Sequence, residues 1–425
     1  MFHYNYKSFS FSILSRYYFL IILIVVSLFR LFYFALPNAK EKNFVVHVTI
    51  SNPIYIEESQ KIIKTSEYKI LTYDLPYKRS SNDRILELGD IVKVTGTRYH
   101  NLVYADKVEF IKESKIKFLL KIKGLFIRAS NTMLSEPLAS LLNGILIGVE
   151  PVISPEYKEV LIKVGVIHII VVSGYNISVL FSIATKALNP FSIKFRIFLG
   201  IFLAIIYCFI VGFEPPVIRA LVMGTIAGSG VAFGKVRSTL YIFLISALAM
   251  IIYNPHFFYS LSFQLTIMAT LGIILLSGVM RVTFDRFRVV SFIPKLLKED
   301  FYASFSAQLF VLPIISFYFG RVSLLGFVVN PLILWIIPII MVIGFIYGLF
   351  FVLGFWFLLK YFTFLLEAPL MFFNDFVSLM AKIPSGVVDI SIDFYILVLY
   401  YSLIFIFLLY FYKIFRIPFL KKLYN

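Results

Sequence analysis

Long apolar runs separated by short polar stretches dominate the pattern of the chain. A helix of about 20 apolar residues crosses a bilayer, and runs near this length recur from residue 159 onward. The candidate spans lie near residues 159–185, 196–212, 217–233, 239–253, 257–280, 301–319, 323–359, 361–381 and 394–412. Together with an earlier apolar run, they predict a polytopic α-helical membrane protein with about ten spans.

The earlier run, near residues 17–36, follows Lys7 and Arg16 and has the position of a signal peptide. It is longer than the apolar core of a signal peptide, contains Arg30 and has no clear small-residue cleavage site before Pro37. We therefore expect residues 1–36 to form a cytoplasmic tail and a retained transmembrane helix.

Residues 37–116 have a different pattern, in which β-branched and aromatic residues alternate with polar ones. Short runs of this kind predict β-strands, and the clearest cover residues 43–50, 68–75, 90–99 and 101–111. About five short strands fit a small β-barrel, and the last two runs, joined at a polar turn, are typical of an oligonucleotide-binding (OB-like) barrel. A generic antiparallel β-domain fits the alternation equally well.

Residues 117–158 combine two short helical patterns. In the first, over 117–129, the apolar side chains fall near one helical face and three lysines elsewhere: Phe118, Leu119, Ile122, Phe126 and Ile127 against Lys117, Lys121 and Lys123. This pattern predicts an amphipathic helix that lies on the membrane. The second, over 138–148, is apolar but too short to cross, so we expect an interfacial or re-entrant helix. Residues 159–425 then form a multi-span channel domain.

Charged residues are few and unevenly placed. The 425 residues include 40 Lys and Arg and 23 Asp and Glu, for a net charge of +17, while 60% of all residues are hydrophobic. This composition excludes a soluble globular protein. Between the predicted spans, the cations gather in alternate loops. Because Lys and Arg in short loops favour the cytoplasm, we expect both termini inside and the β-domain outside. The cation-rich loops all lie inside only if residues 323–359, broken at Asn330 and Pro331, cross the membrane once. We therefore expect a single crossing with an irregular portion.

Polar side chains within the spans are the candidate functional residues. A charge at the centre of a membrane helix costs about 2.5 to 3.5 kcal/mol on insertion scales, so such groups need partners or a water-filled path. The candidates for lining such a path are His168, Ser173, Asn176, Arg219, Gln264, Gln308 and Asn330. A plainer interpretation stays open, because Ser, Asn and Gln in spans also join helices by hydrogen bonds.

Enzyme chemistry has little support in the sequence. The five histidines are scattered, and neither an HExxH zinc motif nor a phosphate-binding GxxxxGK[ST] motif is present. The serine of VVSGYN lacks the GxSxG context of a serine nucleophile. We therefore expect no catalytic residue, no metal and no cofactor. Glu367 and Asp375 could serve proton coupling, although a hydrogen-bonded structural role is the simpler alternative.

Five segments in a fixed order carry a family resemblance: LLNGILIG, GVIHIIVVSGYNISVL, PPVIRALVM, YSLSFQLTIMATLGI and SLLGFVVNPLILWIIP. With them the chain resembles the ComEC-type competence protein family, the membrane channel for DNA uptake in naturally transformable bacteria. His168, Ser173 and Gly174 match the family's HLLAISGLH stretch, whereas Tyr175 and Asn176 replace its usual Leu and His. The other matching motif positions are Arg219, Met223, Ser262, Gln264, Ala269, Thr270 and Asn330.

Two departures accompany the resemblance. Many family members carry a C-terminal metallo-β-lactamase-like domain with an HxHxDH site, thought to degrade the strand that is not transported, and this sequence has no such motif. Cys208 is the only cysteine, so a disulfide in the β-barrel of relatives would have no counterpart.

The resemblance implies a channel that translocates single-stranded DNA across the bacterial inner membrane during natural competence. It also implies separate partners, namely a cytoplasmic ATPase motor, a DNA receptor and a nuclease, and it is compatible with a homo-oligomer. Two other interpretations stay open. One is a transporter of another anionic or lipidic substrate, and the other is a reduced, inactive relative that acts as a membrane scaffold.

Overall fold

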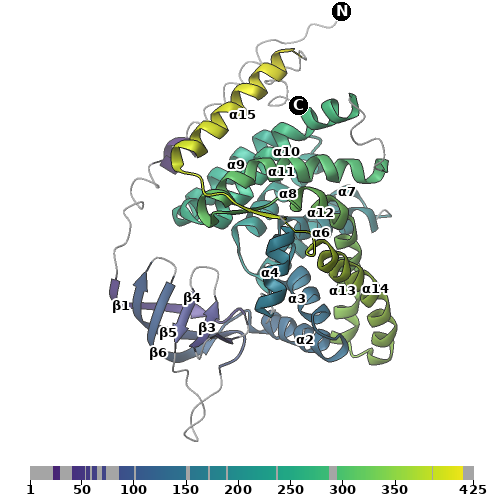
Figure 1. Cartoon of the computed structure of the whole chain (residues 1–425). Helices are drawn as coiled ribbons and strands as arrows, with labels where there is room; N and C mark the ends of the chain where they lie inside the picture. Colours follow the sequence, from purple (N-terminus) through teal and green to yellow (C-terminus); the bar gives the residue numbers. More distant parts are fainter. Residues whose placement is uncertain are drawn as a thin grey trace, which may run out of the picture.

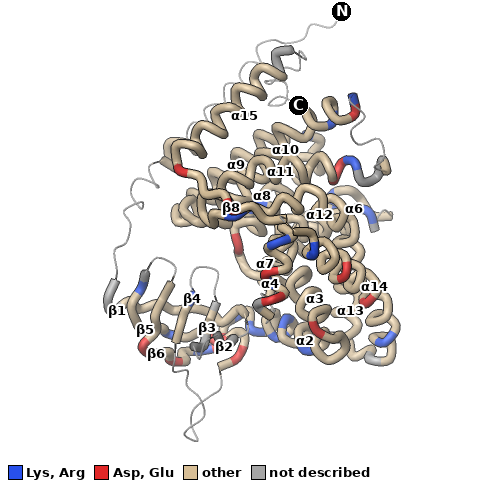
Figure 2. Tube along the Cα trace, viewed as in Figure 1, with Lys and Arg blue, Asp and Glu red and all other residues tan. Residues whose placement is uncertain are grey.

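The computed structural model describes residues 23–28, 41–52, 54–57, 60–64, 69–72, 86–99, 102–149, 154–170, 173–187, 190–235, 238–286, 294–384 and 386–414. A β-sheet domain is joined to a bundle of helices (Figure 1), and the helices of the bundle carry few charged residues along most of their length (Figure 2). Of the predicted first span, only residues 23–28 are described, and they are helical. The rest of that span and the basic residues beyond 414 lie outside the described residues.

Six strands form the β-sheet domain: β1 (Glu41–Thr49), β2 (Tyr55–Glu57), β3 (Gln60–Lys64), β4 (Lys69–Thr72), β5 (Asp90–Tyr99) and β6 (Leu102–Glu113). Their order in the sheet is β1-β5-β6-β4-β3-β2, and among these described strands only β4 and β6 pair in parallel. The four alternating runs predicted as strands correspond to β1, β4, β5 and β6, while β2 and β3 are additional. β1 and β2 follow each other in the chain but lie at opposite edges of the sheet.

The alternation predicts the strands because successive side chains of a strand point to opposite faces. In β5, Val92 and Val94 are fully buried, whereas Lys93 between them is half-exposed. The pairing with β6 shifts by one residue at Gly96. A side chain at that position would collide with the Tyr104 carbonyl, so the close approach of the two strands requires glycine.

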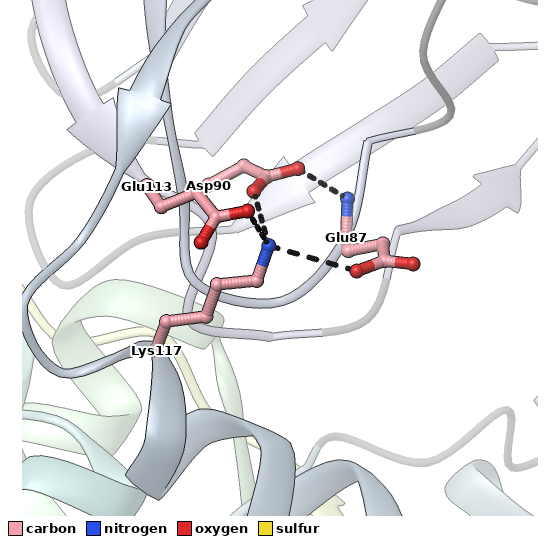
Figure 3. A network of polar contacts seen from close by, with 4 residues as sticks. All are labelled: Glu87, Asp90, Glu113 and Lys117. Atoms are coloured by element: carbon pink, nitrogen blue, oxygen red, sulfur yellow. Dashed lines mark hydrogen bonds and ion pairs between the residues drawn. The ribbon is translucent and has the colours of Figure 1, made fainter.

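Helix α2 (Lys117–Met133) fastens the sheet to the helical bundle. The buried Lys117 ammonium donates to Glu113 at 2.7 Å and to Asp90 at 3.1 Å, and it lies 3.7 Å from Glu87 (Figure 3). Asp90, which is fully buried, also accepts the backbone N–H of Glu87 at 2.9 Å. Removal of the ammonium would therefore take the Lys117 ion pair away from a buried carboxylate.

The predicted faces of this helix are wrong in one respect. Lys117 and Lys123 belong to the expected polar face but are buried, whereas Phe118 of the expected apolar face is 73% exposed, as a side chain that faces lipid would be. The inner side of α2 meets the ends of strands, where carboxylates and carbonyl oxygens pair with ammonium groups. A paired ammonium tolerates burial that an unpaired one does not, and helical periodicity carries no information about such partners.

Lys123 is the second buried link between α2 and the sheet. Its ammonium donates to the Ser51 carbonyl at 3.0 Å and to Asn52 Oδ1 at 2.7 Å. Burial lowers the pKa of Lys123 from 10.5 to about 7, although the nearby Glu214 acts in the opposite direction.

The Lys123 side chain predicts a pH dependence of stability. Between pH 7 and pH 10.5 the unfolded chain binds more protons at this residue than the folded chain does. The free energy of unfolding should therefore rise with pH between pH 7 and pH 10.5, by up to about 1.4 kcal/mol per pH unit. Below pH 7 the side chain is protonated in both states, so Lys123 should add no pH dependence there. Thermal unfolding of the wild type and Lys123→Met at several pH values measures the effect. Parallel pH profiles of the two proteins would contradict it.

Helix α3 (Leu138–Ile147) has ten residues, and all of them are buried. It is enclosed by α2 and by the later helices α13 (Ile337–Val352) and α14 (Trp356–Met380) (Figure 1). The helix is therefore enclosed by protein, and its interfacial or re-entrant placement stays a prediction.

The run predicted as one span over residues 159–185 is three helices: α4 (Pro155–Val164), α5 (Ile167–Ile170) and α6 (Gly174–Ala187). The described residues of this candidate span therefore do not form one continuous helix. α4 ends at Gly165, which has a φ of 80° and donates its N–H to the Ile162 and Leu161 carbonyls. Glycine favours this left-handed helix end, but an apolar run that contains glycine is equally compatible with an unbroken helix.

Most of the other predicted spans correspond to single helices: α7 (Ile193–Val211), α8 (Pro215–Ala232), α9 (Thr239–Tyr253), α10 (Leu261–Arg286), α11 (Lys295–Phe319), α14 and α15 (Phe394–Ile414). A short 3-10 helix, η1 (Pro255–Tyr259), joins α9 to α10. Within the described part of the chain, seven helical segments are long and apolar enough to cross a membrane. The protein is therefore a polytopic helical membrane protein, and the total of about ten crossings stays a prediction.

The run near residues 323–359 is divided into α12 (Gly326–Ile333), a 3-10 turn η2 (Leu334–Ile336) and α13. The break predicted at Asn330 and Pro331 is wrong, because α12 continues through both residues and the irregular part is η2. The short strand β7 (Arg321–Ser323) before it pairs with β8 (Val387–Asp389), which lies between α14 and α15. The far end of α13 packs on α2: the Tyr347 hydroxyl donates to the Ala129 carbonyl at 3.0 Å, and Gly348 gives room to the Phe126 ring.

Helix α11 contains Pro313, which cannot donate to the carbonyl of Leu309 four residues earlier. The Tyr400 hydroxyl of α15 donates to that carbonyl at 3.0 Å, and the Tyr401 hydroxyl donates to the Phe310 carbonyl at 2.6 Å. α15 therefore satisfies a backbone acceptor that the proline leaves free.

Tyr400→Phe is expected to destabilise the protein by about 1 kcal/mol, because one partly buried acceptor loses its donor. Tyr410→Phe is the matched control, since Tyr410 lies on the same helix and is 64% exposed. Thermal unfolding in detergent compares the two. Equal melting temperatures would show that the Leu309 carbonyl does not depend on Tyr400.

Candidate functional site

The start of α6 and the second turn of α8 meet inside the helical bundle. Ser173 precedes α6, and Gly174 is its first residue. A Cβ atom on Gly174 would lie 2.8 Å from Arg219 Nη2 and 3.0 Å from the Pro216 carbonyl oxygen. Because Gly174 has no side chain, the guanidinium of Arg219 reaches the first turn of α6.

The Arg219 guanidinium donates a hydrogen bond to the backbone. Its Nη1 donates to the Thr266 carbonyl of α10 at 2.6 Å, and the same carbonyl accepts from the Thr270 hydroxyl at 2.8 Å. Its Nε is buried without a hydrogen-bond partner. Among the described residues, no carboxylate forms an ion pair with this guanidinium. A cation inside a membrane protein without a counter-ion is suited to an anionic ligand.

Asn176 has a different environment from the one predicted for a path-lining residue. It is buried, and its side-chain amide donates to the Ile145 carbonyl at 2.7 Å and to the Tyr207 hydroxyl at 2.9 Å. Tyr207 in turn donates to the Leu146 carbonyl at 2.8 Å. These bonds join α6 to α3 and α7, so Asn176 holds the start of α6 in place and makes the interhelical contacts of the plainer interpretation.

Gln308 and Asn330 form a second polar group, on α11 and α12. Gln308 Nε2 donates to the Gly326 carbonyl at 2.6 Å. A Cβ atom on Gly326 would lie 3.2 Å from Gln308 Oε1 and 3.5 Å from Asn330 Nδ2, so both amides lie beside this glycine. Asn330 is buried, and its Oδ1 has no hydrogen-bond partner. Gly165, at the end of α4, packs against the same glycine.

The remaining two candidates lie apart from each other. His168 is on α5, in the broken segment that leads from Gly165 to Gly174, and its side chain is exposed. Gln264 is in the first turn of α10, where its Nε2 donates to the Phe258 carbonyl at 3.2 Å and its Oε1 accepts from the Tyr318 hydroxyl at 3.1 Å. Gln264 therefore joins the adjoining ends of η1, α10 and α11.

The structure thus divides the seven candidates. It brings Ser173, Asn176 and Arg219 to the start of α6, where the Ser173 hydroxyl donates to Asn176 Oδ1 at 3.4 Å, and it places Gln308 and Asn330 together at Gly326. The segment with His168 runs between the two groups. Sequence reasoning missed Tyr207 and the packing role of Gly165 and Gly326, because an aromatic or glycine residue in an apolar run gives no signal of its own.

Comparison with known proteins identifies relatives of the chain. The family model described as "Competence protein" matches residues 145–414, which include all seven candidates. The ComE operon protein 3 of Bacillus subtilis (strain 168) is 26% identical over 222 residues, which cover 50% of this chain and 26% of that protein. An uncharacterized protein of Aquifex aeolicus (strain VF5) is 28% identical over 238 residues, which cover 53% of each chain.

The chain thus matches about a quarter and about half of the lengths of these two relatives. No solved structure matches it. The family match, in contrast, extends over more than half of the chain and runs from the end of α3 to the end of α15. The protein therefore belongs to the competence protein family.

Proposed function

We propose that this protein conducts single-stranded DNA across the bacterial cell membrane during DNA uptake, and that the strand passes the start of α6. The observation that carries the proposal is Arg219, a guanidinium inside the membrane bundle that has no acidic partner among the described residues. The competence protein family, to which the chain belongs, and the relative ComE operon protein 3 of Bacillus subtilis support DNA as the anion.

The geometry at Arg219 suits a phosphate group. The N–H groups of the first turn of a helix are unpaired and carry partial positive charge, so a helix start binds anions. Discontinuous membrane helices use such starts to hold anionic substrates. Here the guanidinium lies beside the start of α6, because Gly174 leaves the space open. A phosphate in this place would accept from both the helix and Arg219.

Features of the β-sheet domain support the proposal independently of Arg219. β1 and β2 are consecutive in the chain but lie at the two edges of the sheet, which favours a curled sheet that closes as a small OB-like barrel. The exposed Tyr104 and the Arg98 guanidinium, 5.1 Å from the Phe44 ring centre, offer stacking and phosphate contacts. Such groups bind unpaired strands without sequence preference.

We further propose an orientation with the β-domain outside and both termini in the cytoplasm, on the basis of the cation distribution. The energy for transport would come from a separate cytoplasmic ATPase, because the sequence has no phosphate-binding loop. A DNA receptor and a nuclease would be further separate partners. In this scheme the protein is a conduit and not an enzyme.

A transporter of another anion is the second candidate, and the same observation favours it, because a lone guanidinium at a helix start binds any small anion. Uptake of labelled DNA by a deletion strain, with and without the restored gene, separates the two. Restored uptake of DNA supports the conduit. Unchanged DNA uptake on deletion, together with a changed flux of a small anion, supports the transporter, and no change in either supports a scaffold.

A further inference from the structure

The outward side of α2 carries a stripe of apolar and basic side chains: Phe118, Lys121, Leu125 and Arg128. Spacings of three and four residues place them on one side of the helix. Phe118 is 73% and Leu125 is 39% exposed, and the two cations are exposed as well. The opposite side is buried against the sheet and the bundle, so the stripe is the free face of α2.

This stripe adjoins an apolar surface of the helical bundle. Phe126 of α2 packs against Gly348 of α13, and two nearby leucines are exposed: Leu349 of α13 by 56%, and Leu353, which directly follows this helix, by 57%. Exposed apolar side chains at the end of a membrane helix face lipid. α2 runs between the sheet domain and this end of the bundle (Figure 1).

We propose that the α2 stripe is a binding surface for anionic lipid headgroups. Phe118 and Leu125 would enter the region between headgroups and acyl chains, and Lys121 and Arg128 would contact lipid phosphates, as on other amphipathic interfacial helices. Lipid fits the stripe better than nucleic acid does, because half of its side chains are apolar and the exposed end of α13 continues them. The inference does not depend on the proposed transport of DNA.

The surface has a consequence for the β-sheet domain. The inner side of α2 holds the sheet through Lys117 and Lys123, which bind Asp90 and the Ser51 carbonyl. A helix fixed to lipid on one side and to the sheet on the other sets the height and the tilt of the sheet above the membrane.

The test uses the full chain with Cys208→Ser, in nanodiscs of equal parts phosphatidylcholine and phosphatidylglycerol. A fluorescent probe at Phe118→Cys is expected to be quenched by brominated phosphatidylglycerol more strongly than by brominated phosphatidylcholine. The matched control is the same probe at Asp106→Cys, on the exposed side of β6, which should not be quenched.

Charge reversal tests the two cations directly. Lys121→Glu and Arg128→Glu should each lower the preference for phosphatidylglycerol about fivefold, whereas Lys107→Glu in the sheet should leave it unchanged. An unquenched probe at position 118 would overturn the proposal, as would equal quenching by both brominated lipids. Protection of the probe by an added oligonucleotide, with loss of the lipid preference, would instead assign the stripe to nucleic acid and also overturn it.

Discussion

Replacing Arg219 with alanine is expected to reduce DNA uptake by about thirtyfold or more at an unchanged level of the protein. A hydrogen bond between an ion and its charged partner contributes about 2 kcal/mol, which corresponds to that factor. The bond to the Thr266 carbonyl is also lost, but the guanidinium has no acidic partner among the described residues that would be left unpaired. Uptake of labelled DNA, normalised to membrane-inserted protein, measures the effect.

Two variants make this result specific. Arg219→Lys keeps the charge but cannot form the planar double contact with a phosphate, so an intermediate loss is expected. Arg196→Ala is the matched control, because Arg196 Nη1 also donates to a backbone carbonyl, that of Thr185, at 2.6 Å. It should stay within about twofold of the wild type, the range expected for a loss of a few tenths of a kcal/mol. Wild-type uptake by Arg219→Ala would remove Arg219 from the path.

Replacing Lys117 with methionine is expected to destabilise the junction of the sheet and α2 by about 3 to 5 kcal/mol, because it leaves the fully buried Asp90 carboxylate without its ammonium. Glu113 and Glu87 contribute less, since both are about half exposed to solvent, at 52% and 61%. Limited proteolysis of the sheet domain in the full chain, as a function of denaturant, measures the change.

The control for this prediction is Lys121→Met, because Lys121 lies one turn further along α2 and is exposed. It should change stability by less than about 0.5 kcal/mol. Adding Asp90→Asn to Lys117→Met should recover part of the loss, since the buried charge is then removed. Equal protease resistance of Lys117→Met and Lys121→Met would show that the ion pair does not hold the junction.

Local patterns predict much of the fold. The strands β1, β5 and β6 follow from alternation, because one face of the sheet is buried and the other is not. The spans α7 to α11 follow from their length and apolar composition. The broken span at Gly165 does not, because the break depends on the packing of Gly165 against Gly326, which lies 161 positions further along the chain.

The candidate site shows the same limit. The cost of polar groups in a membrane identifies Ser173, Arg219 and Asn330 as notable without any structure. This cost does not show which of these residues lie in contact. Asn176 has the same sequence signal as Ser173, yet its amide nitrogen donates to the Ile145 carbonyl and the Tyr207 hydroxyl, and its Oδ1 accepts from Ser173 itself. The buried lysines of α2 were assigned to the wrong face for a related reason, since their partners come from strands more than 25 residues away or from the preceding strand end.

The most direct test of the central claim is to trap a DNA strand at the start of α6 during uptake. Ser173→Cys in a Cys208→Ser background would react with DNA that carries a thiol-reactive group on an internal phosphorothioate. If the strand passes the start of α6, a covalent adduct forms at position 173 and becomes much weaker with Arg219→Ala, and none forms at Tyr395→Cys, which is 84% exposed on α15. Labelled DNA that enters the cell while position 173 reacts no more than position 395 would exclude this route.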